Sequence, residues 1–153
     1  MPKVTIIKAD LANLSHRNAV VGMIDAYASD AMGGGRPLLA DARERLGSAL
    51  QSHPMAHVFL AYDGIDPVGV AVCFLGFSTF AARPLLNLHD LAVLPTHRRR
   101  GVGHALLEQV ASAARSLGCC KVTLEVRADN APAQALYQSV GFAGDTRFLE
   151  KPL

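Results

Sequence analysis

The sequence predicts an α/β protein in which helices cover a mixed sheet, with the elements in the order β-α-α-β-β-β-α-β-α-β. Two observations favour this fold class. Short β-rich runs alternate with stretches whose apolar residues recur at helical spacing, and a strand, a helix and a second strand follow one another within residues 86–127. Such a unit normally forms a right-handed parallel crossover. The length of 153 residues, half of them hydrophobic, suits one domain spanning 1–153.

The first half of the chain is predicted to form a strand, two helices and two further strands. Ser15 can cap the first helix, and Gly33-Gly34-Gly35 follows that helix as a flexible loop. Asp63-Gly64 and Pro67 are turn signals between the last two strands, which favours a hairpin. The predicted ranges are 4–8 for the first strand, 15–28 and from 41 for the helices, and 56–62 and 68–77 for the hairpin.

The second half is predicted to form three strands and two helices. Gly118 would end the longer helix as a C-cap residue, Asn130 is a good N-cap for the shorter one, and Gly141 would end it. The strands are expected at 86–93, 121–127 and 148–151, and the helices at 103–117 and 131–139.

Composition excludes several classes of protein. A formal net charge of +2 is too small to predict a nucleic-acid partner. Strongly apolar stretches such as Val68–Leu75 are much shorter than the roughly 20 residues that span a bilayer. The start, Met1–Ile6, has no apolar signal region, so we expect a cytoplasmic protein without a membrane partner. Cys73, Cys119 and Cys120 have no disulfide or zinc spacing, and no other spacing predicts a metal site.

The stretch between residues 89 and 103 has the composition of a phosphate site. A strand ends, a loop turns, and a helix begins at Gly101 and Gly103, directly after Arg98-Arg99-Arg100. A helix N-terminus offers free N–H groups and the positive end of a dipole, glycine allows close approach, and arginine adds charge. The stretch lacks the P-loop pattern and the third glycine of the dinucleotide fingerprint.

Two motifs in this order resemble those of the GNAT acetyltransferase superfamily. Residues 98–103 resemble its R/Q-x-x-G-x-G/A loop, and a downstream N-x-x-A-x-x-L-Y-x-x-x-G-F pattern begins at Asn130. The resemblance covers roughly residues 56–151 and implies the GNAT acyl-CoA N-acyltransferase fold. Leu88–Val93 also resembles the L-E-D-L-x-V strand of members that acetylate polyamines and other small amines, with His89 in place of Glu. The downstream pattern consists of Asn130, Ala133, Leu136, Tyr137, Gly141 and Phe142.

The resemblance implies a binding site for acetyl-coenzyme A as cosubstrate. The pantetheine arm would pair with backbone groups around Leu91, Ala92 and Val93, where an N–H polarises the thioester carbonyl. Asn130 would bond the arm or its neighbouring backbone, and Tyr137 would protonate the departing thiolate. The residues expected around the pyrophosphate are Arg98, Arg99, Arg100, Gly101, Val102, Gly103 and His104.

The attacking amine must lose a proton, and the sequence leaves three acceptors open for it: His89, Glu125 or ordered water. Asp90 and Glu125 could instead be structural and pair with Arg127 or with the loop. The reaction implied is transfer of the acetyl group to a primary amine by direct attack.

The acceptor, a small molecule or a protein amine, is expected beside the loop that joins the first two helices. Two rival functions are a catalytically silent coenzyme A-binding regulatory domain and a structural subunit of an acetyltransferase complex. A homodimer, frequent in the family, stays open. The residues predicted for the acceptor are Asp30, Met32 and Gly34, with Phe77 and Phe80 on the opposite wall.

Overall fold

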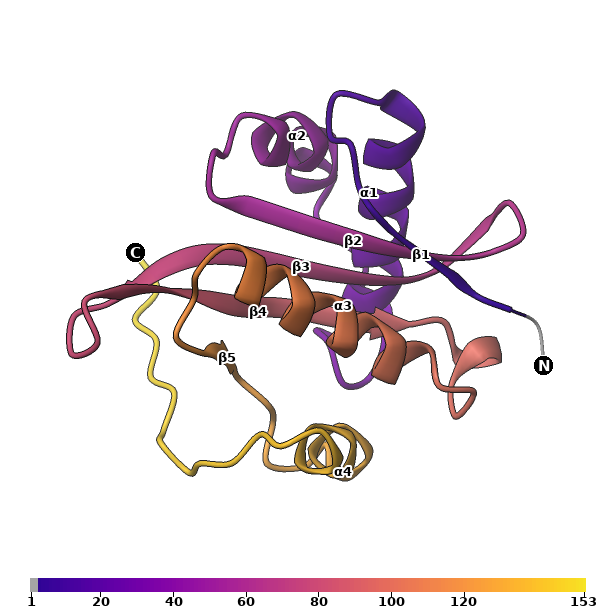
Figure 1. The fold of residues 1–153 in the computed structure, drawn as a ribbon. Coiled ribbons are helices and arrows are strands. Elements are labelled where there is room, and N and C mark those ends of the chain that lie inside the picture. The colour runs from indigo at the N-terminus through magenta and orange to yellow at the C-terminus, as the bar shows by residue number, and fades with distance from the viewer. Residues whose placement is uncertain (1–2) are drawn as a thin grey trace.

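A five-stranded mixed sheet forms the centre of the computed structural model, which describes residues 3–153 (Figure 1). Met1 and Pro2, part of the N-terminal stretch without a signal region, lie outside the described residues. The strand order is β1-β2-β3-β4-β5, with antiparallel neighbours as far as β4 and a parallel β4–β5 pair, as the predicted crossover requires. The strands are β1 (Thr5–Lys8), β2 (Ala56–Asp63), β3 (Asp66–Ser78), β4 (Arg83–Val93) and β5 (Val122–Leu124).

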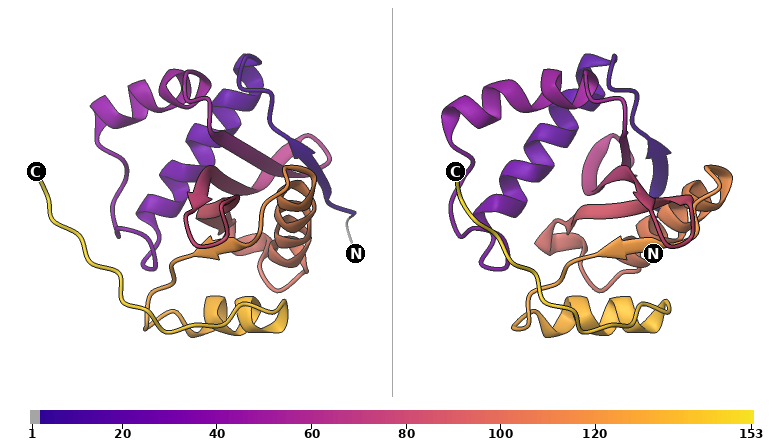
Figure 2. Two further views of the ribbon diagram at one scale, coloured as in Figure 1. Left: turned by 60° about the vertical axis from the view of Figure 1, so that its left-hand side comes forward. Right: turned by 90° about the vertical axis from the view of Figure 1, so that its left-hand side faces the viewer.

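Helices cover both faces of the sheet. Two of them, α1 and α2, lie on one face, α3 lies on the other, and α4 lies beyond β5 (Figures 1 and 2). Alternate residues of β2 contribute to two separate cores, because Phe59 and Ala61 pack with α3 while Val58 and Leu60 pack with α1. The helices are α1 (Leu14–Ser29), α2 (Ala40–Gln51), α3 (Val102–Ser116) and α4 (Ala131–Ser139), with a short 3₁₀ turn at Pro95–His97. None of the helices in residues 3–153 is long and apolar enough to cross a membrane.

A bulge in β4 changes which side chains face α1. Cys73 pairs with Leu88 and Val72 pairs with Asp90, so the residue between them, His89, has no partner on β3. Leu88 and Leu91 both pack on the α3 side. The two residues between these leucines therefore lie toward the α1 side, where the ring centroid of His89 is 5.6 Å from that of Phe74.

One predicted helix cap and two predicted strands differ in the structure. Asn13, not Ser15, caps α1, and its side chain accepts a hydrogen bond from the N–H of His16. The strand expected at 121–127 spans only Val122–Leu124, because the chain leaves β4 after that point. The strand expected at 148–151 is wrong. Phe148 and the residues around it are exposed and have no neighbouring strand, and β-propensity alone does not form a strand without a partner.

The loop between α1 and α2 is a hydrogen-bonded turn, which corrects the expectation of a flexible loop. The N–H groups of Gly33 and Gly35 donate to the carbonyl of Asp30, and the N–H of Gly34 donates to Ala28. A Cβ on Gly33 would lie 2.0 Å from the carbonyl oxygen of Tyr27, so only glycine fits there. The loop therefore has one defined shape and enters the site as a fixed wall.

Candidate active site

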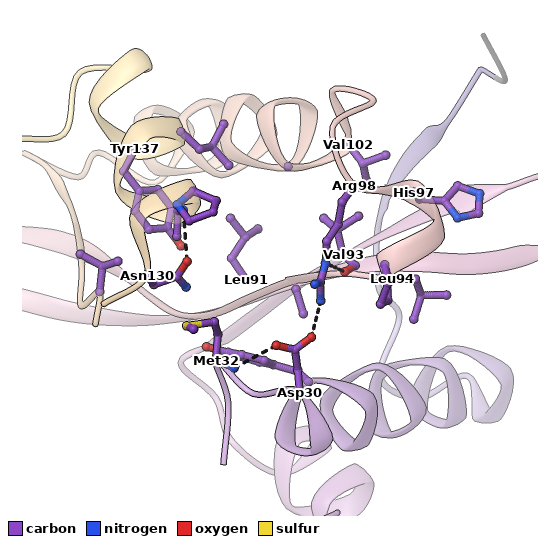
Figure 3. Close-up of a pocket in the computed structure, with 18 of the residues that line it drawn as sticks. Asp30, Met32, Leu91, Val93, Leu94, His97, Arg98, Val102, Asn130 and Tyr137 are labelled. Atoms are coloured by element: carbon purple, nitrogen blue, oxygen red, sulfur yellow. Dashed lines mark hydrogen bonds and ion pairs between the residues drawn. The ribbon is translucent and has the colours of Figure 1, made fainter. Parts of the chain in front are cut away.

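A large pocket lies where β4 and β5 separate. Its volume is about 1020 Å³, at the upper end of the range usual for small-molecule sites. Its walls come from α1, the end of β4, the loop into α3, the segment after β5, and α4 (Figure 3). The predicted residues that line it are Asp30, Met32, His89, Leu91, Ala92, Val93, Arg98, Arg99, Gly101, Val102, Gly103, His104, Glu125, Asn130 and Tyr137.

Four predicted residues lie outside the lining of this pocket. Phe77 and Phe80 are at the far end of the β3–β4 hairpin, where both side chains are exposed. Arg100 is an exposed residue of the loop before α3, and Gly34 lies two positions after Met32, which is the last residue of the loop between α1 and α2 to line the pocket. The expectation that Phe77 and Phe80 form the opposite wall is therefore wrong, because strand order does not determine at which end of the sheet a site forms.

The loop into α3 presents a row of backbone N–H groups. Arg99 and Gly101 have positive φ angles of 63° and 82°, and α3 begins at the next residue, Val102. In the described part of the chain, no protein group accepts a hydrogen bond from the backbone N–H groups of residues 99–104. Free N–H groups beside residues in the left-handed region, at the positive end of a helix, form a concave anion site. This arrangement fits a pyrophosphate.

Gly103 has a different role from Gly101. A Cβ on Gly101 would meet no atom within 4 Å, whereas a Cβ on Gly103 would lie 2.9 Å from Cδ2 of Leu136. Gly103 therefore allows α3 to approach α4 closely, and Gly101 provides the left-handed turn that precedes the helix.

Arg98 is already engaged within the protein. Its Nε donates to the carbonyl of Val93 at 3.0 Å, and its Nη2 pairs with Oδ2 of Asp30 at 2.6 Å. The hydrogen bond from Arg98, supported by one from the N–H of Met32, holds the pKa of Asp30 below its usual value. Arg98 thus connects the loop before α3 to the loop after α1, a role that its sequence motif does not indicate.

His97 holds the same loop from another side, and no sequence pattern predicts this role. Its Nε2 lies 3.0 Å from Oδ2 of Asp63 in the β2–β3 turn, and its Nδ1 lies 2.9 Å from Oγ1 of Thr96. The side chain of His97 is only 17% exposed. This contact fixes the turn that directly precedes the free N–H groups.

Removal of this contact is expected to weaken coenzyme A binding. We expect Asp63→Ala to raise the dissociation constant of coenzyme A by about tenfold, since hydrogen bonds to ionised groups contribute roughly 1.5–3 kcal/mol. Pantetheine, which lacks the pyrophosphate, should bind as it does to the wild type. Calorimetry with both ligands measures this, and Asp66→Ala in the same turn is the matched control. An equal loss for both ligands would assign the contact to general stability instead.

Tyr137 supplies a buried hydroxyl at the other wall of the pocket. Burial, with a smaller contribution from Tyr27, raises the pKa of Tyr137 to about 12. Its ring packs edge-on against Phe142, with centroids 5.8 Å apart. Asn130 caps α4 by accepting a hydrogen bond from the N–H of Ala133, as predicted. Tyr137 therefore keeps its proton at neutral pH and can donate it into the pocket.

His89 and Glu125 lie at the point where the sheet opens. The last paired residues of β4 and β5 are Leu88 and Leu124, and the next residue of each strand lines the pocket. Burial raises the pKa of Asp90. Arg127 pairs with neither Asp90 nor Glu125, because its guanidinium forms a bidentate ion pair with Asp129.

The cysteines lie away from the pocket lining. Cys73 is buried, and burial raises the pKa of its thiol to about 12. Burial also raises the pKa of the Cys119 thiol. These positions give no geometric support to a covalent cysteine mechanism.

Comparison with known proteins defines the class of the chain. It matches the acetyltransferase (GNAT) family over residues 21–142 and belongs to that family. It is 47% identical over 56 residues to the ribosomal protein bS18-alanine N-acetyltransferase of Escherichia coli K12, a match that covers 37% of this chain and 38% of the enzyme. It is 31% identical over 91 residues to the thialysine N-epsilon-acetyltransferase of Caenorhabditis elegans, covering 60% of this chain and 56% of that enzyme. The chain therefore spans less than two thirds of these relatives.

The fold is also that of a solved acetyltransferase. The structure of the aminoglycoside enzyme AAC(6')-Iy, in complex with the bisubstrate analogue CoA-S-monomethyl-acetylneamine, superposes with a TM-score of 0.79 at 20% sequence identity. The superposition covers 99% of this chain and 98% of that chain. At this identity the likeness establishes the fold and leaves the acceptor open.

Proposed function

We propose that this protein transfers an acetyl group from acetyl-coenzyme A to a primary amine by direct attack within a ternary complex. One observation supports the proposal most strongly. The free N–H groups of residues 99–104 and the buried hydroxyl of Tyr137 belong to the same pocket, at the separation of β4 and β5. A phosphate cradle and a proton donor beside one opening are what this transfer needs.

Each part of the pocket has a role in this proposal. Acetyl-coenzyme A supplies an activated thioester whose carbonyl carbon accepts the amine nitrogen as the carbon–sulfur bond breaks. Backbone groups of Leu91, Ala92 and Val93 would hold the pantetheine arm, and residues 99–104 the pyrophosphate. Tyr137 would give its proton to the departing sulfur. His89, Glu125 or a water molecule beside them would accept the proton that the amine loses.

The regulatory alternative is less well supported. A domain that only senses coenzyme A needs the phosphate cradle, but it does not need an un-ionised tyrosine beside the opening of the sheet. The named acceptors of the relatives are as different as a ribosomal protein alanine and thialysine, so they do not select one amine for this chain. The cytoplasmic location stays a prediction, and the oligomeric state stays open.

The test is a screen of amines with detection of released thiol, together with thermal unfolding. Acetyl-coenzyme A should raise the unfolding temperature, because a ligand that binds only the native state stabilises it. At least one amine should accelerate thiol release above the hydrolysis rate. Stabilisation without turnover on any amine would favour the regulatory domain, and absence of stabilisation would overturn both functions.

A further inference from the structure

The acceptor side of the pocket is spanned by the loop after α1. Arg98, from the segment after β4, pairs with Asp30 of this loop at 2.6 Å. Arg127, from the segment after β5, donates from Nη1 to the carbonyl oxygen of Gly33 at 3.3 Å. The loop is thus attached to both borders of the gap between the two strands. In Figure 3, Asp30 lies across the cavity from Tyr137, and Met32 lies on the same side as Asp30, next to Asn130 in this view.

This attached loop has little freedom to move as a lid. Four of its N–H groups, those of residues 33–36, donate to the carbonyls of Asp30 and Ala28, and the N–H of Met32 donates to the Asp30 carboxylate at 2.9 Å. The backbone of Gly33 fits closely against Tyr27. Met32, between the two attachment points, is half-buried and lines the pocket. The acceptor therefore meets a side wall that is already formed.

The charges on this side of the pocket favour a cation. The carboxylate of Glu125 lines the pocket and forms no ion pair among the described residues. Burial is the main cause that raises the pKa of the pocket residue Tyr27, and the carboxylate of Asp90 is the second cause. Asp90 therefore lies near this wall of the pocket. Two of the arginines that line the pocket are already paired, Arg98 with Asp30 and Arg127 with Asp129. An ammonium group that enters beside Glu125 therefore meets a carboxylate that no cation of the described residues neutralises.

We infer that the acceptor is a small cationic amine and that the loop of residues 30–36 excludes polypeptide acceptors. This inference rests on the proposed function and names its substrate class. A lysine or an N-terminus within a polypeptide carries flanking residues, each of which extends about 3.3–3.6 Å, and these need an open groove beside the reacting amine. Here the contacts of Arg98 with Asp30 and of Arg127 with Gly33 hold the loop across one side of the pocket, where it would obstruct such a groove.

The first test uses pairs of acceptors that share the reacting amine and differ in size. One pair is Nα-acetyl-lysine amide and a ten-residue peptide with one central lysine, and a second is alaninamide and a ten-residue peptide that begins with alanine. Spermidine adds a small dication. We expect kcat/KM for the better small amine to exceed that of its peptide partner by at least tenfold. A peptide that reacts equally well or better would overturn the inference and leave the proposed acetyl transfer intact, and no reaction with any amine would remove both.

The second test detaches the loop. Arg127→Met removes the bond to Gly33, and we expect the ratio of peptide to small-amine kcat/KM to rise several-fold while the coenzyme A dissociation constant stays within about twofold. Arg36→Met makes the same change on the same loop, at a side chain without hydrogen bonds or ion pairs among the described residues, and should leave the ratio unchanged. If Arg127→Met does not fold, Asp30→Asn weakens the other attachment. An unchanged ratio in the variant that folds would show that the loop does not select acceptor size.

Discussion

Gly101→Asp is expected to weaken acetyl-coenzyme A binding by about a hundredfold or more and to leave the protein folded. The new carboxylate would stand beside the free N–H groups at the start of α3, where it would occupy the anion site and repel the pyrophosphate. Two unit charges about 4 Å apart near a protein surface interact with roughly 4 kcal/mol. The fold should tolerate the side chain, because a Cβ at this position meets no atom within 4 Å and Asp accepts the left-handed conformation better than most residues.

The matched control for this prediction is Gly101→Asn. Asn has the same size and the same tolerance of a positive φ, but it carries no charge. The dissociation constant of coenzyme A, measured by calorimetry, should therefore increase much less for Asn than for Asp. Similar affinities for the two variants would show that the pyrophosphate binds elsewhere. Gly103 is a poorer test position, because any side chain there also collides with Leu136.

Tyr137→Phe is expected to slow the chemical step by about a hundredfold, the low end of the range for general-acid catalysis, and barely to change coenzyme A affinity. The ring and its contact with Phe142 remain, so packing survives and only the proton is lost. The loss stays at the low end because a thiolate is already a fair leaving group. Since burial raises the pKa of Tyr137 to about 12, the wild type should keep this advantage into alkaline solution and lose it only as the pH approaches that value.

Single-turnover acetyl transfer by the two proteins, with a dissociation constant for each, measures this effect. Steady-state turnover can hide it when product release is slow. Equal single-turnover rates would reduce Tyr137 to a packing residue, and a large loss of affinity with normal chemistry would make it a residue that positions the cofactor.

The part of the pocket proposed to hold the cofactor is formed by residues that the sequence predicts, because these residues are close together in the chain. Gly101 and the N–H groups after it follow from a strand, a turn and a helix in succession, and Asn130 follows from local capping chemistry. These features depend on neighbours within one or two helical turns. Sequence patterns report such neighbours directly.

The contacts that fix the acceptor side could not be predicted in the same way. Arg98 and Asp30 are 68 residues apart, and His97 and Asp63 are 34 apart. No periodicity links such partners, because they meet only after the sheet has formed. The sequence also predicts too long a strand at β5. β-branched residues favour a strand, but β5 ends where its pairing with β4 ends, at Leu124.

The two walls of the pocket come from separate stretches of the chain. The wall that contains Met23, Tyr27 and Met32 lies within the first third of the sequence, whereas the cofactor wall begins at Leu91 and continues to Tyr137. Under the proposed function, substitutions in the first stretch can therefore reshape the space for the amine without changing the N–H groups that would bind the phosphates. Exchange of the first stretch between related genes would transplant an acceptor preference onto an unchanged cofactor site, so new specificities in such a protein can arise by recombination as well as by point mutation.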